Sequence, residues 1–456
     1  MPKQQVHRPL ATSRRAFLRN AGALTLAPWV IPASALGADG ATAPSNRTTL
    51  GFIGVGFMGQ RHHLSRFVGY PEAQVLAVCD VDRWRRENAL ATVDTAYAAQ
   101  RTAGTYRGCS GYNDLRELLA RDDIDAVLIA TGDRWHGTAA VLAARAGKDA
   151  YVEKSLCLTI AEGRAMVEAM RRYGRVCQVG LQQRSGREFQ LACRLVRQGA
   201  LGKIHTIYVI SPGVSADVDL PAEPVPDGLD WDLWLGPAPW RPFNSRFHQY
   251  GQTKGVVPWN FCRDFGGGML TSNDVHSFDV VQWALEMDHS GPVEIVPPGA
   301  GSSGSLTFKY PGDVLVHVVD KRLDPKKHFI PKGWDTLTSI QNFGALFIGE
   351  RGWIHVGRSG YLTAQPAELV ADNLGRYDRF VALENHHHNW LQAVRTRARP
   401  ACDVAVGCQS TIVALLGCIA CWTGRTLKWD PVQETFLNDS EANRLRRRAM
   451  RAPWQV

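Results

Sequence analysis

Three glycines and one aspartate have the spacing of a site for a phosphate-bearing ligand. Gly54, Gly56 and Gly59 form the pattern G-x-G-x-x-G directly after a strand-like apolar run and directly before a helix-like segment. Such glycines permit a tight turn and let the backbone approach a pyrophosphate, whose charge the N-terminus of the helix stabilises. Asp80 ends the next apolar run, at roughly the 20-residue distance where a carboxylate accepts hydrogen bonds from ribose hydroxyls and repels a 2′-phosphate. The pattern therefore predicts a dinucleotide site that prefers NAD to NADP.

Two further segments place polar side chains at the ends of predicted strands. The segment 130–140, "ATGDRWHGTAA", follows one apolar run, and Glu153 and Lys154 follow another, "DAYV". Open parallel sheets bind ligands at the carboxyl ends of their strands. A Glu-Lys pair is an unusual choice at such a position, so we expect both segments to border the same cleft as the glycine loop. His136 could flank a nicotinamide ring there.

The order of the predicted elements explains how these segments come together. Over 46–182, strand-like runs such as "AQVLAVCD" and "IDAVLIAT" alternate with amphipathic helices, which is typical of a parallel sheet with helices on both faces. From 183 the pattern changes to helices, a loop rich in proline and tryptophan over 221–244, and alternating strands. We therefore predict an α/β protein with two domains. The first is a Rossmann dinucleotide-binding domain over 46–182, and the second is a substrate-binding α+β domain with a mostly antiparallel sheet over 183–456.

The sequence resembles the Gfo/Idh/MocA oxidoreductase family. The glycine loop, T-x-D-x-W-H and Glu-Lys occur in the order of that family, followed by "VGLQQRS", "WDLWLGPAPWRP", "GGGMLTSNDVHSFDVVQWAL", "GRTLKWDP" and "RAPW". The tryptophan-rich loop is similar to that of exported members that act on sugars and sugar derivatives. The resemblance implies an NAD-dependent enzyme with a small carbohydrate as substrate. We expect it to be a homo-oligomer that binds no nucleic acid.

The resemblance assigns Lys154 to the reaction itself. Glu153 and Lys154 match the family's Glu-Lys-Pro element, whose lysine lies near the nicotinamide and the substrate. Its ammonium could polarise or protonate a sugar oxygen. Ser155 replaces the proline, which leaves the turn geometry after Lys154 open. The expected cofactor-binding residues are Gly54, Gly56, Phe57, Met58, Gly59, Asp80, Thr131, His136, Glu153 and Lys154.

The second motif of the family is only partly present. After a glycine run the family has Asp, three residues, His, two residues and Asp; here His276 and Asp279 fit, but Ser272 replaces the first aspartate. Asp274 lies two residues further on, an offset that points to nearly the opposite face of a helix. His276 is therefore the expected general acid or base, unless it is a structural histidine. The expected substrate contacts, of which the last could instead support the fold, are Gln183, Arg184 and Asp279.

Charge and cysteine usage argue against several other functions. The net charge is +9, but the basic cluster over 444–451 is typical of a solvated helix face, and basic residues do not alternate with aromatic ones as in nucleic-acid modules. Cys418 and Cys421 form a C-x-x-C inside an apolar, helix-like run. His386, His387 and His388 open another helix. Neither group predicts a metal site.

Residues 1–38 have the three regions of an export signal. Arg14 and Arg15 precede an apolar run over 21–31 and the small residues 33–35, which form a cleavage site. The paired arginines resemble the twin-arginine signal, and the apolar run is too short and too weak for a stable membrane span. We expect export to the periplasm. Because that route carries folded proteins, NAD could travel inside the protein.

Three functions stay open at this point. The first is net oxidation of a ring hydroxyl of a sugar, with a second acceptor that reoxidises the cofactor. The second is glycoside cleavage: transient oxidation of a ring carbon acidifies the neighbouring C–H, the aglycone leaves, water adds, and the ketone is reduced again. The third is a carbohydrate-binding protein that carries NAD without turnover, suggested by Ser155 and Ser272 at motif positions.

Overall fold

The computed structural model describes residues 43, 46–211, 213–250, 258–300, 304–370, 375, 378 and 380–455. The predicted export signal, residues 1–38, lies outside the described residues. The chain divides into two units, residues 1–47 and residues 48–456. Every helix and strand named below belongs to the second unit.

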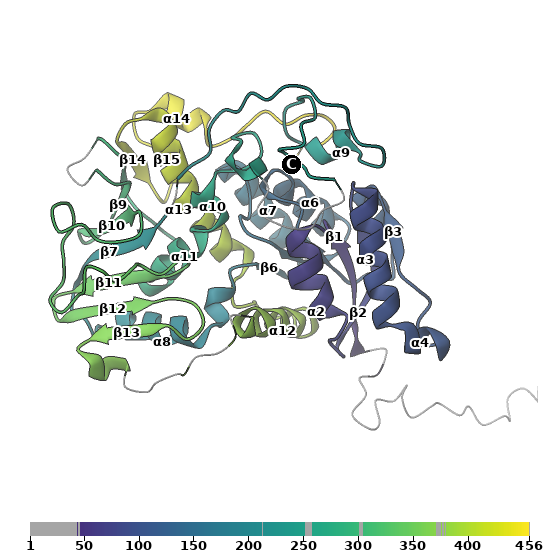
Figure 1. The fold of residues 1–456 in the computed structure, drawn as a ribbon, viewed down its shortest axis with the longest axis horizontal. Helices are drawn as coiled ribbons and strands as arrows, with labels where there is room; N and C mark the ends of the chain where they lie inside the picture. The colour runs from purple at the N-terminus through teal and green to yellow at the C-terminus, as the bar shows by residue number, and fades with distance from the viewer. Residues whose placement is uncertain are drawn as a thin grey trace, which may run out of the picture. The chain divides into compact units, whose positions relative to one another are not determined.

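A six-stranded parallel sheet forms one layer of this unit, in the order β3-β2-β1-β4-β5-β6 (Figure 1). This is the strand order of the doubly wound dinucleotide-binding fold, and it confirms the predicted α/β class. The strands are largely buried apolar runs, as expected for a sheet with helices on both faces. They are β1 (Thr48–Ile53), β2 (Ala73–Cys79), β3 (Ser110–Tyr112), β4 (Ala126–Ile129), β5 (Asp149–Val152) and β6 (Cys177–Val179).

Side-chain caps fix where several helices of this layer begin. The Asp82 carboxylate accepts a hydrogen bond from Arg85 N at the start of α3, and the Thr159 hydroxyl accepts one from Glu162 N at the start of α7. A π-helical segment, η4, follows the glycine loop directly. The helices are η4 (Phe57–Leu64), α2 (Ser65–Phe67), α3 (Arg83–Ala96), α4 (Ala98–Thr102), α5 (Leu115–Leu119), α6 (Asp133–Arg145) and α7 (Ile160–Arg172).

The second layer is a nine-stranded sheet in the order β13-β12-β11-β7-β10-β9-β8-β14-β15. Among the described strands of this sheet, only β7 and β10 pair in parallel, which confirms the mostly antiparallel sheet. Trp334 and Ile340, from the segment that follows β10, pack against one face of this sheet. The strands are β7 (Ile204–Ile210), β8 (Glu294–Val296), β9 (Thr307–Tyr310), β10 (Val314–Val319), β11 (Ala345–Gly349), β12 (Gly352–Val356), β13 (Leu362–Gln365), β14 (Leu427–Asp430) and β15 (Thr435–Phe436).

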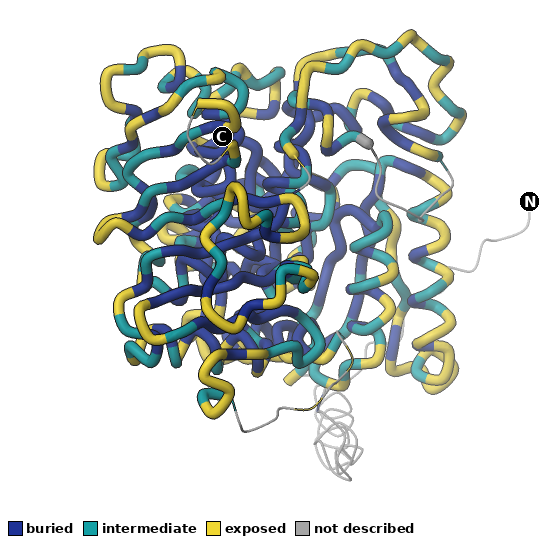
Figure 2. Tube along the Cα trace, turned by 60° about the vertical axis from the view of Figure 1, so that its left-hand side comes forward, coloured by how far each residue is buried: buried dark blue, intermediate teal, exposed yellow. Residues whose placement is uncertain are grey.

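Two C-terminal helices connect the two sheets. Trp390 and Leu391 of α12 share an apolar cluster with Leu50 and Phe52 of β1, and α13 packs against α7 and β6. Figure 2 shows the resulting buried segments in both layers. The remaining helices are η5 (Gln182–Ser185), α8 (Arg187–Arg197), α9 (Trp231–Leu235), η6 (Pro258–Phe261), α10 (Met269–Ser272), α11 (Val275–Ala284), η7 (Ala367–Val370), α12 (Val381–Thr396), α13 (Val404–Thr423) and α14 (Ser440–Arg444).

Helix α13 has the length and apolar character that a membrane span requires, and within the described ranges it is the only helix that does. The protein itself buries 83% of its most apolar stretch. Helices α11 and α7 pack on it, so α13 forms part of the core that supports the site described next.

Candidate active site

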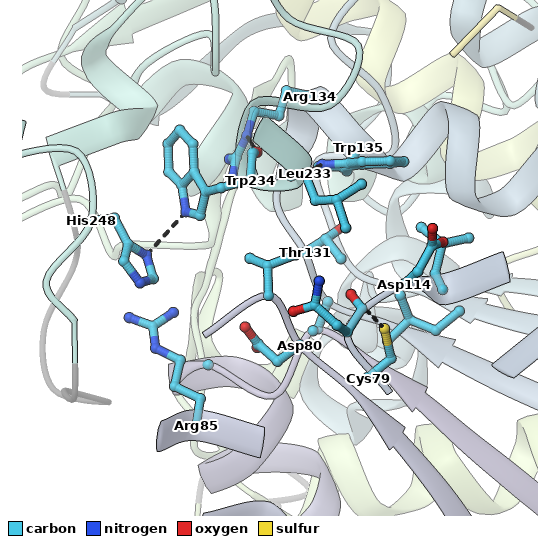
Figure 3. Close-up of a pocket in the computed structure, with 17 residues that line it drawn as sticks. Cys79, Asp80, Arg85, Asp114, Thr131, Arg134, Trp135, Leu233, Trp234 and His248 are labelled. Atoms are coloured by element: carbon cyan, nitrogen blue, oxygen red, sulfur yellow. Dashed lines mark hydrogen bonds between the residues drawn. The ribbon is translucent and has the colours of Figure 1, made fainter. Parts of the chain in front are cut away.

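A cavity lies at the carboxyl ends of β1, β2 and β4 (Figure 3). Four of the predicted cofactor-binding residues line it: Gly54, Gly56, Asp80 and Thr131. Phe57, Met58 and Gly59 form the first turn of η4, and His136, Glu153 and Lys154 lie outside the lining. Trp135, from the T-x-D-x-W-H motif, and Trp234, from the tryptophan-rich loop, also line it. Lining residues that the sequence did not single out include Arg85, Asn113, Asp114, Arg134, Leu233 and His248.

The glycine loop leaves no room for side chains. Gly54 has a φ of 84°, and a Cβ atom there would lie 2.7 Å from backbone atoms of Ala130. A Cβ atom at Gly59 would overlap the carbonyl oxygen of Gly54. The backbone of the loop therefore lies directly beside the cavity, as binding of a pyrophosphate requires.

The carboxylate of Asp80 is fixed at the edge of this cavity. Its Oδ2 accepts a hydrogen bond from Val55 N at 2.8 Å, and its Oδ1 accepts one from Asp82 N at 3.0 Å. Asp80 thus joins the glycine loop to the start of α3. Each oxygen keeps a further lone pair for a ribose hydroxyl, so the predicted contact fits the geometry.

The tryptophan-rich loop contributes to the same cavity. The guanidinium of Arg134 lies over the ring of Trp234 at 3.5 Å, and its Nε donates to Trp234 O at 2.8 Å. Trp234 in turn donates to His248 Nδ1 at 3.0 Å, and its ring stacks on Trp231. Figure 3 shows Trp234 and Arg134 on the side of the cavity opposite Asp80. These tryptophans anchor a packed loop, whereas Trp240 is 66% exposed.

Arg134 is a buried cation with an unused donor. Its Nη1 has no hydrogen-bond partner in the part of the chain that the structure describes, and burial lowers its pKa to about 9. A buried guanidinium beside a cavity is suited to an anionic group. The glycine loop, Asp80 and this donor together fit a dinucleotide with its pyrophosphate.

His136 holds two strand ends together. Its Nε2 accepts from Gly132 N at 3.1 Å, after β4, and its Nδ1 donates to Ser155 O at 2.6 Å, after β5. Burial lowers the pKa of His136 to about 4, so the ring is neutral at pH 7. In this arrangement both ring nitrogens of His136 are used in positioning the Lys154 segment.

The Lys154 side chain reaches across to the second layer. Its Nζ donates to Ser272 O at 2.5 Å, and the adjacent Ser155 hydroxyl donates to Thr271 O at 2.5 Å. The peptide bond between Lys154 and Ser155 is cis. Asp133 lies close by, and burial raises its pKa to about 6 although the charge of Lys154 opposes this. Lys154 therefore lies where the two layers meet, beside a second ionisable group.

Glu153 points into a buried histidine network. Its Oε1 lies 3.0 Å from His63 Nε2, and His63 Nδ1 lies 2.9 Å from Nε2 of His387 on α12. Burial opposes ionisation of Glu153, but the hydrogen bond and charge of His63 outweigh it and lower the pKa. His63 was not predicted. Its only signal in the sequence is a polar residue in the helix after the glycine loop.

His276 faces two side chains from other elements. The Gln183 amide has one orientation that satisfies its neighbours. In that orientation the Gln183 amide nitrogen donates to His276 Nδ1 at 2.7 Å, and the Gln183 amide oxygen accepts from Arg358 Nε at 2.9 Å. His276 is 1% exposed; burial, then the charges of Arg358 and Lys154, hold its pKa well below the usual range. Two predicted residues, Gln183 and His276, are thus in contact, and Arg358 is an unpredicted third member.

Arg184 and Asp279 are paired with each other. Arg184 Nε and Nη2 donate to the Asp279 carboxylate at 2.8 to 3.0 Å, and Asp279 also accepts from Ser410 Oγ at 2.7 Å. Asp288 binds the other side of Arg184. This buried ion pair connects η5 with α11. Such a position is consistent with the alternative that Asp279 supports the fold.

The helix of the second motif is interrupted. Helix α10 ends at Ser272 and α11 begins at Val275, so an offset counted along one continuous helix does not apply to Asp274. Asp274 is 3% exposed, its Oδ2 has no hydrogen-bond partner among the residues described, and burial raises its pKa to about 8. The charge of Lys154 acts against this rise. A protonated carboxyl therefore lies near Lys154.

No group of three His, Cys, Asp or Glu side chains in the described ranges is arranged to hold a metal ion. His386 Nε2 donates to Val179 O at 2.9 Å, its Nδ1 lies 2.8 Å from Ser185 Oγ, and His387 contacts His63. The cysteines are free thiols, and Cys418 lies buried in α13. These side chains have structural partners.

Two family models match the chain. One is described as an oxidoreductase family with an NAD-binding Rossmann fold and matches residues 48–181; the other, the C-terminal α/β domain of the same oxidoreductases, matches residues 208–300 and 357–456. Together they cover more than half of the chain.

Curated relatives match this chain over less than half of their own length. A glycosyl hydrolase family 109 protein of Shewanella sp. strain W3-18-1 is 31% identical over 206 residues, which is 42% of this chain and 44% of that protein. An alpha-N-acetylgalactosaminidase of Shewanella oneidensis is 33% identical over 188 residues, 41% of this chain and 39% of that protein. The matches thus span under half the length of these relatives.

Solved structures share the fold at low identity. The aldose-aldose oxidoreductase of Caulobacter crescentus has a TM-score of 0.53 and 16% identity, over 84% of this chain and 99% of that one. The WlbA dehydrogenase of Chromobacterium violaceum, solved with NADH and UDP-GlcNAcA, has a TM-score of 0.54 and 18% identity, over 86% of this chain and 98% of that one. At these identities the likeness concerns the fold.

Proposed function

The chain belongs to the Gfo/Idh/MocA oxidoreductase family, and on that premise we propose that it oxidises a ring hydroxyl of a sugar or sugar derivative with NAD. One observation carries this proposal. A cavity that fits a dinucleotide lies at the carboxyl ends of β1, β2 and β4, and Lys154 follows β5 at the same edge of the sheet. The charge of Lys154 acts on His276 of α11. His136 connects the cavity with Lys154, since it binds Gly132 beside the cavity and Ser155 beside Lys154.

The chain's own residues have separate tasks in this reaction. The glycine loop and Arg134 would hold the pyrophosphate, and Asp80 a ribose. NAD, when bound, supplies an acceptor for the hydride of the ring carbon. A group within hydrogen-bond reach must take the hydroxyl proton as the hydride leaves, and Lys154 and His276 are the candidates. Since Lys154 binds Ser272 O, it is positioned by both layers at once.

A second candidate function is glycoside cleavage without net redox change. It is supported by the relatives named as glycosyl hydrolase family 109 proteins and as an alpha-N-acetylgalactosaminidase. In this reaction the ring carbon is oxidised, the neighbouring C–H loses its proton, the aglycone leaves, water adds, and the ketone is reduced. The first step is the same hydride transfer, so both functions need the same site.

Mass spectrometry of products formed in D₂O separates the possibilities. The purified protein is incubated with a panel of free sugars and aryl glycosides. An oxidised sugar supports the first function, and a hydrolysis product with deuterium at a ring carbon supports the second. No product from any substrate would contradict both, and would favour a carbohydrate-binding protein. Lys154→Met should abolish either product, whereas Lys428→Met, at an exposed position, should not.

We also propose that the protein is exported to the periplasm by the twin-arginine route and functions as a homo-oligomer. Export rests on Arg14, Arg15 and the cleavage site that follows them. A folded precursor can carry its dinucleotide with it, which suits a cavity lined on one side by Trp234 and Arg134. Light scattering of the purified protein tests the oligomeric state.

A further inference from the structure

The contacts of Gln183 determine which nitrogen of His276 carries a proton. Gln183 lies in η5, His276 in α11, and Arg358 just after β12. The Gln183 amide nitrogen lies 2.7 Å from His276 Nδ1, and its oxygen lies 2.9 Å and 3.0 Å from Nε and Nη2 of Arg358. Three elements thus form one hydrogen-bonded chain, buried at its centre because Gln183 and His276 are each 1% exposed.

Arg358 allows the amide only one orientation. A guanidinium has donors and no acceptor, so Gln183 must present its oxygen to Arg358 and its NH₂ group to His276. Arg358 is itself held in place, because its guanidinium lies 3.7 Å over the ring of Phe343 and also donates to Gln182. The Phe343 ring meets His276 edge-on at 5.4 Å. The amide is therefore fixed from its far side.

A donor at Nδ1 sets the tautomer of a neutral imidazole. A nitrogen that accepts a hydrogen bond carries no proton, so the single proton of His276 must be on Nε2. Nε2 has no hydrogen-bond partner within the described part of the protein. His276 consequently offers an N–H donor at Nε2.

The surroundings keep the ring neutral. Lys154 follows β5, Arg358 follows β12 and His386 lies on α12; with burial, these groups lower the pKa of His276. Two carboxyl groups lie close to His276 along the chain. Asp279 is bound to Arg184, and the pKa of Asp274 is raised to about 8, so Asp274 is uncharged at neutral pH. Neither of them supplies a free carboxylate that would stabilise an imidazolium.

Building on the proposed function, we propose that Arg358 and Gln183 hold His276 as the Nε2–H tautomer, so that His276 donates a hydrogen bond to the reacting oxygen of the carbohydrate and Lys154 takes its proton. In this scheme the Lys154 ammonium first gives one proton to solvent, and burial and the charge of Arg358 still keep His276 neutral. The free amine of Lys154 then takes the proton of the carbohydrate hydroxyl and becomes an ammonium again. NAD, when bound, would accept the hydride of the same ring carbon. Nε2–H cannot accept that proton, and giving up its own would require an imidazolate. Gln183 and Arg358 are positioning residues in this scheme. The roles expected of Lys154 and His276 from the sequence are exchanged.

The tautomer can be measured without turnover. Long-range ¹H–¹⁵N spectra of protein labelled with [¹⁵N]histidine distinguish a protonated from an unprotonated ring nitrogen, and His276→Gln identifies the signals of this residue. The wild type should show a protonated Nε2 and a bare Nδ1 from pH 6 to pH 8. A proton on Nδ1 in this range overturns the proposal.

Two isosteric variants give the matched comparison. Gln183→Glu replaces the donor to Nδ1 by an acceptor, so it should move the proton of His276 to Nδ1 or add a second one. Gln182→Glu places the same charge beside Arg358 without facing His276, and should leave the tautomer unchanged. Arg358→Lys keeps a donor-only partner and should preserve Nε2–H, whereas Arg358→Gln should yield a mixture. Equal spectra for Gln183→Glu and Gln182→Glu would refute the arrangement.

Kinetics connect the tautomer to the reaction. Loss of a donor to a developing charge costs roughly 10²-fold in kcat, so Gln183→Glu should lower kcat by about that factor with little change in KM, and Gln182→Glu should not. A wild type without turnover on any carbohydrate refutes the proposed function and the assigned roles, but leaves the spectra as a test of the Arg358–Gln183–His276 chain. If Gln183→Glu moves the proton of His276 to Nδ1 and still keeps full turnover, only the role proposed for His276 is refuted.

Discussion

Nζ of Lys154 lies 2.5 Å from the carbonyl oxygen of Ser272, so the end of a strand in the first sheet is bound to the helix break in the second layer. The family's carboxylate is missing at Ser272, yet its backbone still provides an acceptor for the lysine. This contact joins Lys154 to the segment just before His276, and the charge of Lys154 acts on His276. The chemistry proposed above depends on that position.

The unused donor of Arg134 predicts a role in binding the cofactor. Arg134→Met should weaken the binding of NAD and of ADP-ribose about 10- to 100-fold, which is the loss expected for a charge-assisted hydrogen bond. The affinity for adenosine, which has no phosphate, should not change. Isothermal titration of apo-protein measures all three. Arg145→Met, at an exposed position of the same helix, is the control. An equal loss for adenosine would mean that Arg134 supports the fold of the cavity and not a phosphate.

Asp80 should decide between NAD and NADP. Its charge lies at the cavity edge, where a 2′-phosphate would be repelled. Asp80→Ala should weaken the binding of NAD, because the ribose contact is lost. It should also narrow the difference in affinity between NAD and NADP, because the repulsion of the 2′-phosphate is lost. Because Asp80 also binds Val55 N and Asp82 N, thermal unfolding of the variant serves as a control for the loop. Equal affinity of the wild type for NAD and NADP would rule out this role.

Much of the cofactor half of the site could be predicted because its signals are local. The glycines, the apolar strands and Asp80 lie within one short stretch of sequence, and each strand ends where its apolar run ends. Arg134 was missed because its significance comes from Trp234, a residue 100 positions away that packs against it only in the folded chain.

The substrate half was harder to predict for the same physical reason. Gln183 and His276 were both expected at the cleft, but Arg358 lies on a distant strand end, and no spacing rule connects it with them. The helical offset used for Asp274 presupposes one continuous helix. The structure breaks that helix between Ser272 and Val275.

The buried carboxyl of Asp274 predicts a dependence of stability on pH. Burial raises its pKa from the ordinary value of 3.8 to about 8, so the folded state binds a proton that the unfolded state has lost between these values. The free energy of unfolding should therefore fall as pH rises from 4 to 8, by at most about 1.4 kcal/mol per pH unit from this group. Asp274→Asn cannot ionise and should lack this part of the slope. Urea unfolding of both proteins at several pH values measures it, and parallel curves would contradict a protonated Asp274.

Export is testable apart from the chemistry. A reporter fused to residues 1–40 should reach the periplasm, with cleavage near Ala35, because Arg14 and Arg15 lead a twin-arginine signal. Replacement of both arginines by lysine keeps the charge and should stop export. A reporter that is still exported would show that another route is used.

Reduction of bound NAD by a carbohydrate in a single turnover tests the central claim most directly. The NAD-loaded protein is mixed rapidly with each sugar of the panel, and the absorbance of the reduced nicotinamide is followed. We expect at least one sugar to produce the reduced form in the wild type. Lys154→Met should retain its NAD and be slower by about 10²- to 10⁴-fold, the usual cost of losing a proton-transfer group. Wild-type rates in Lys154→Met, or no reduction by any sugar in the wild type, would contradict the proposed oxidation.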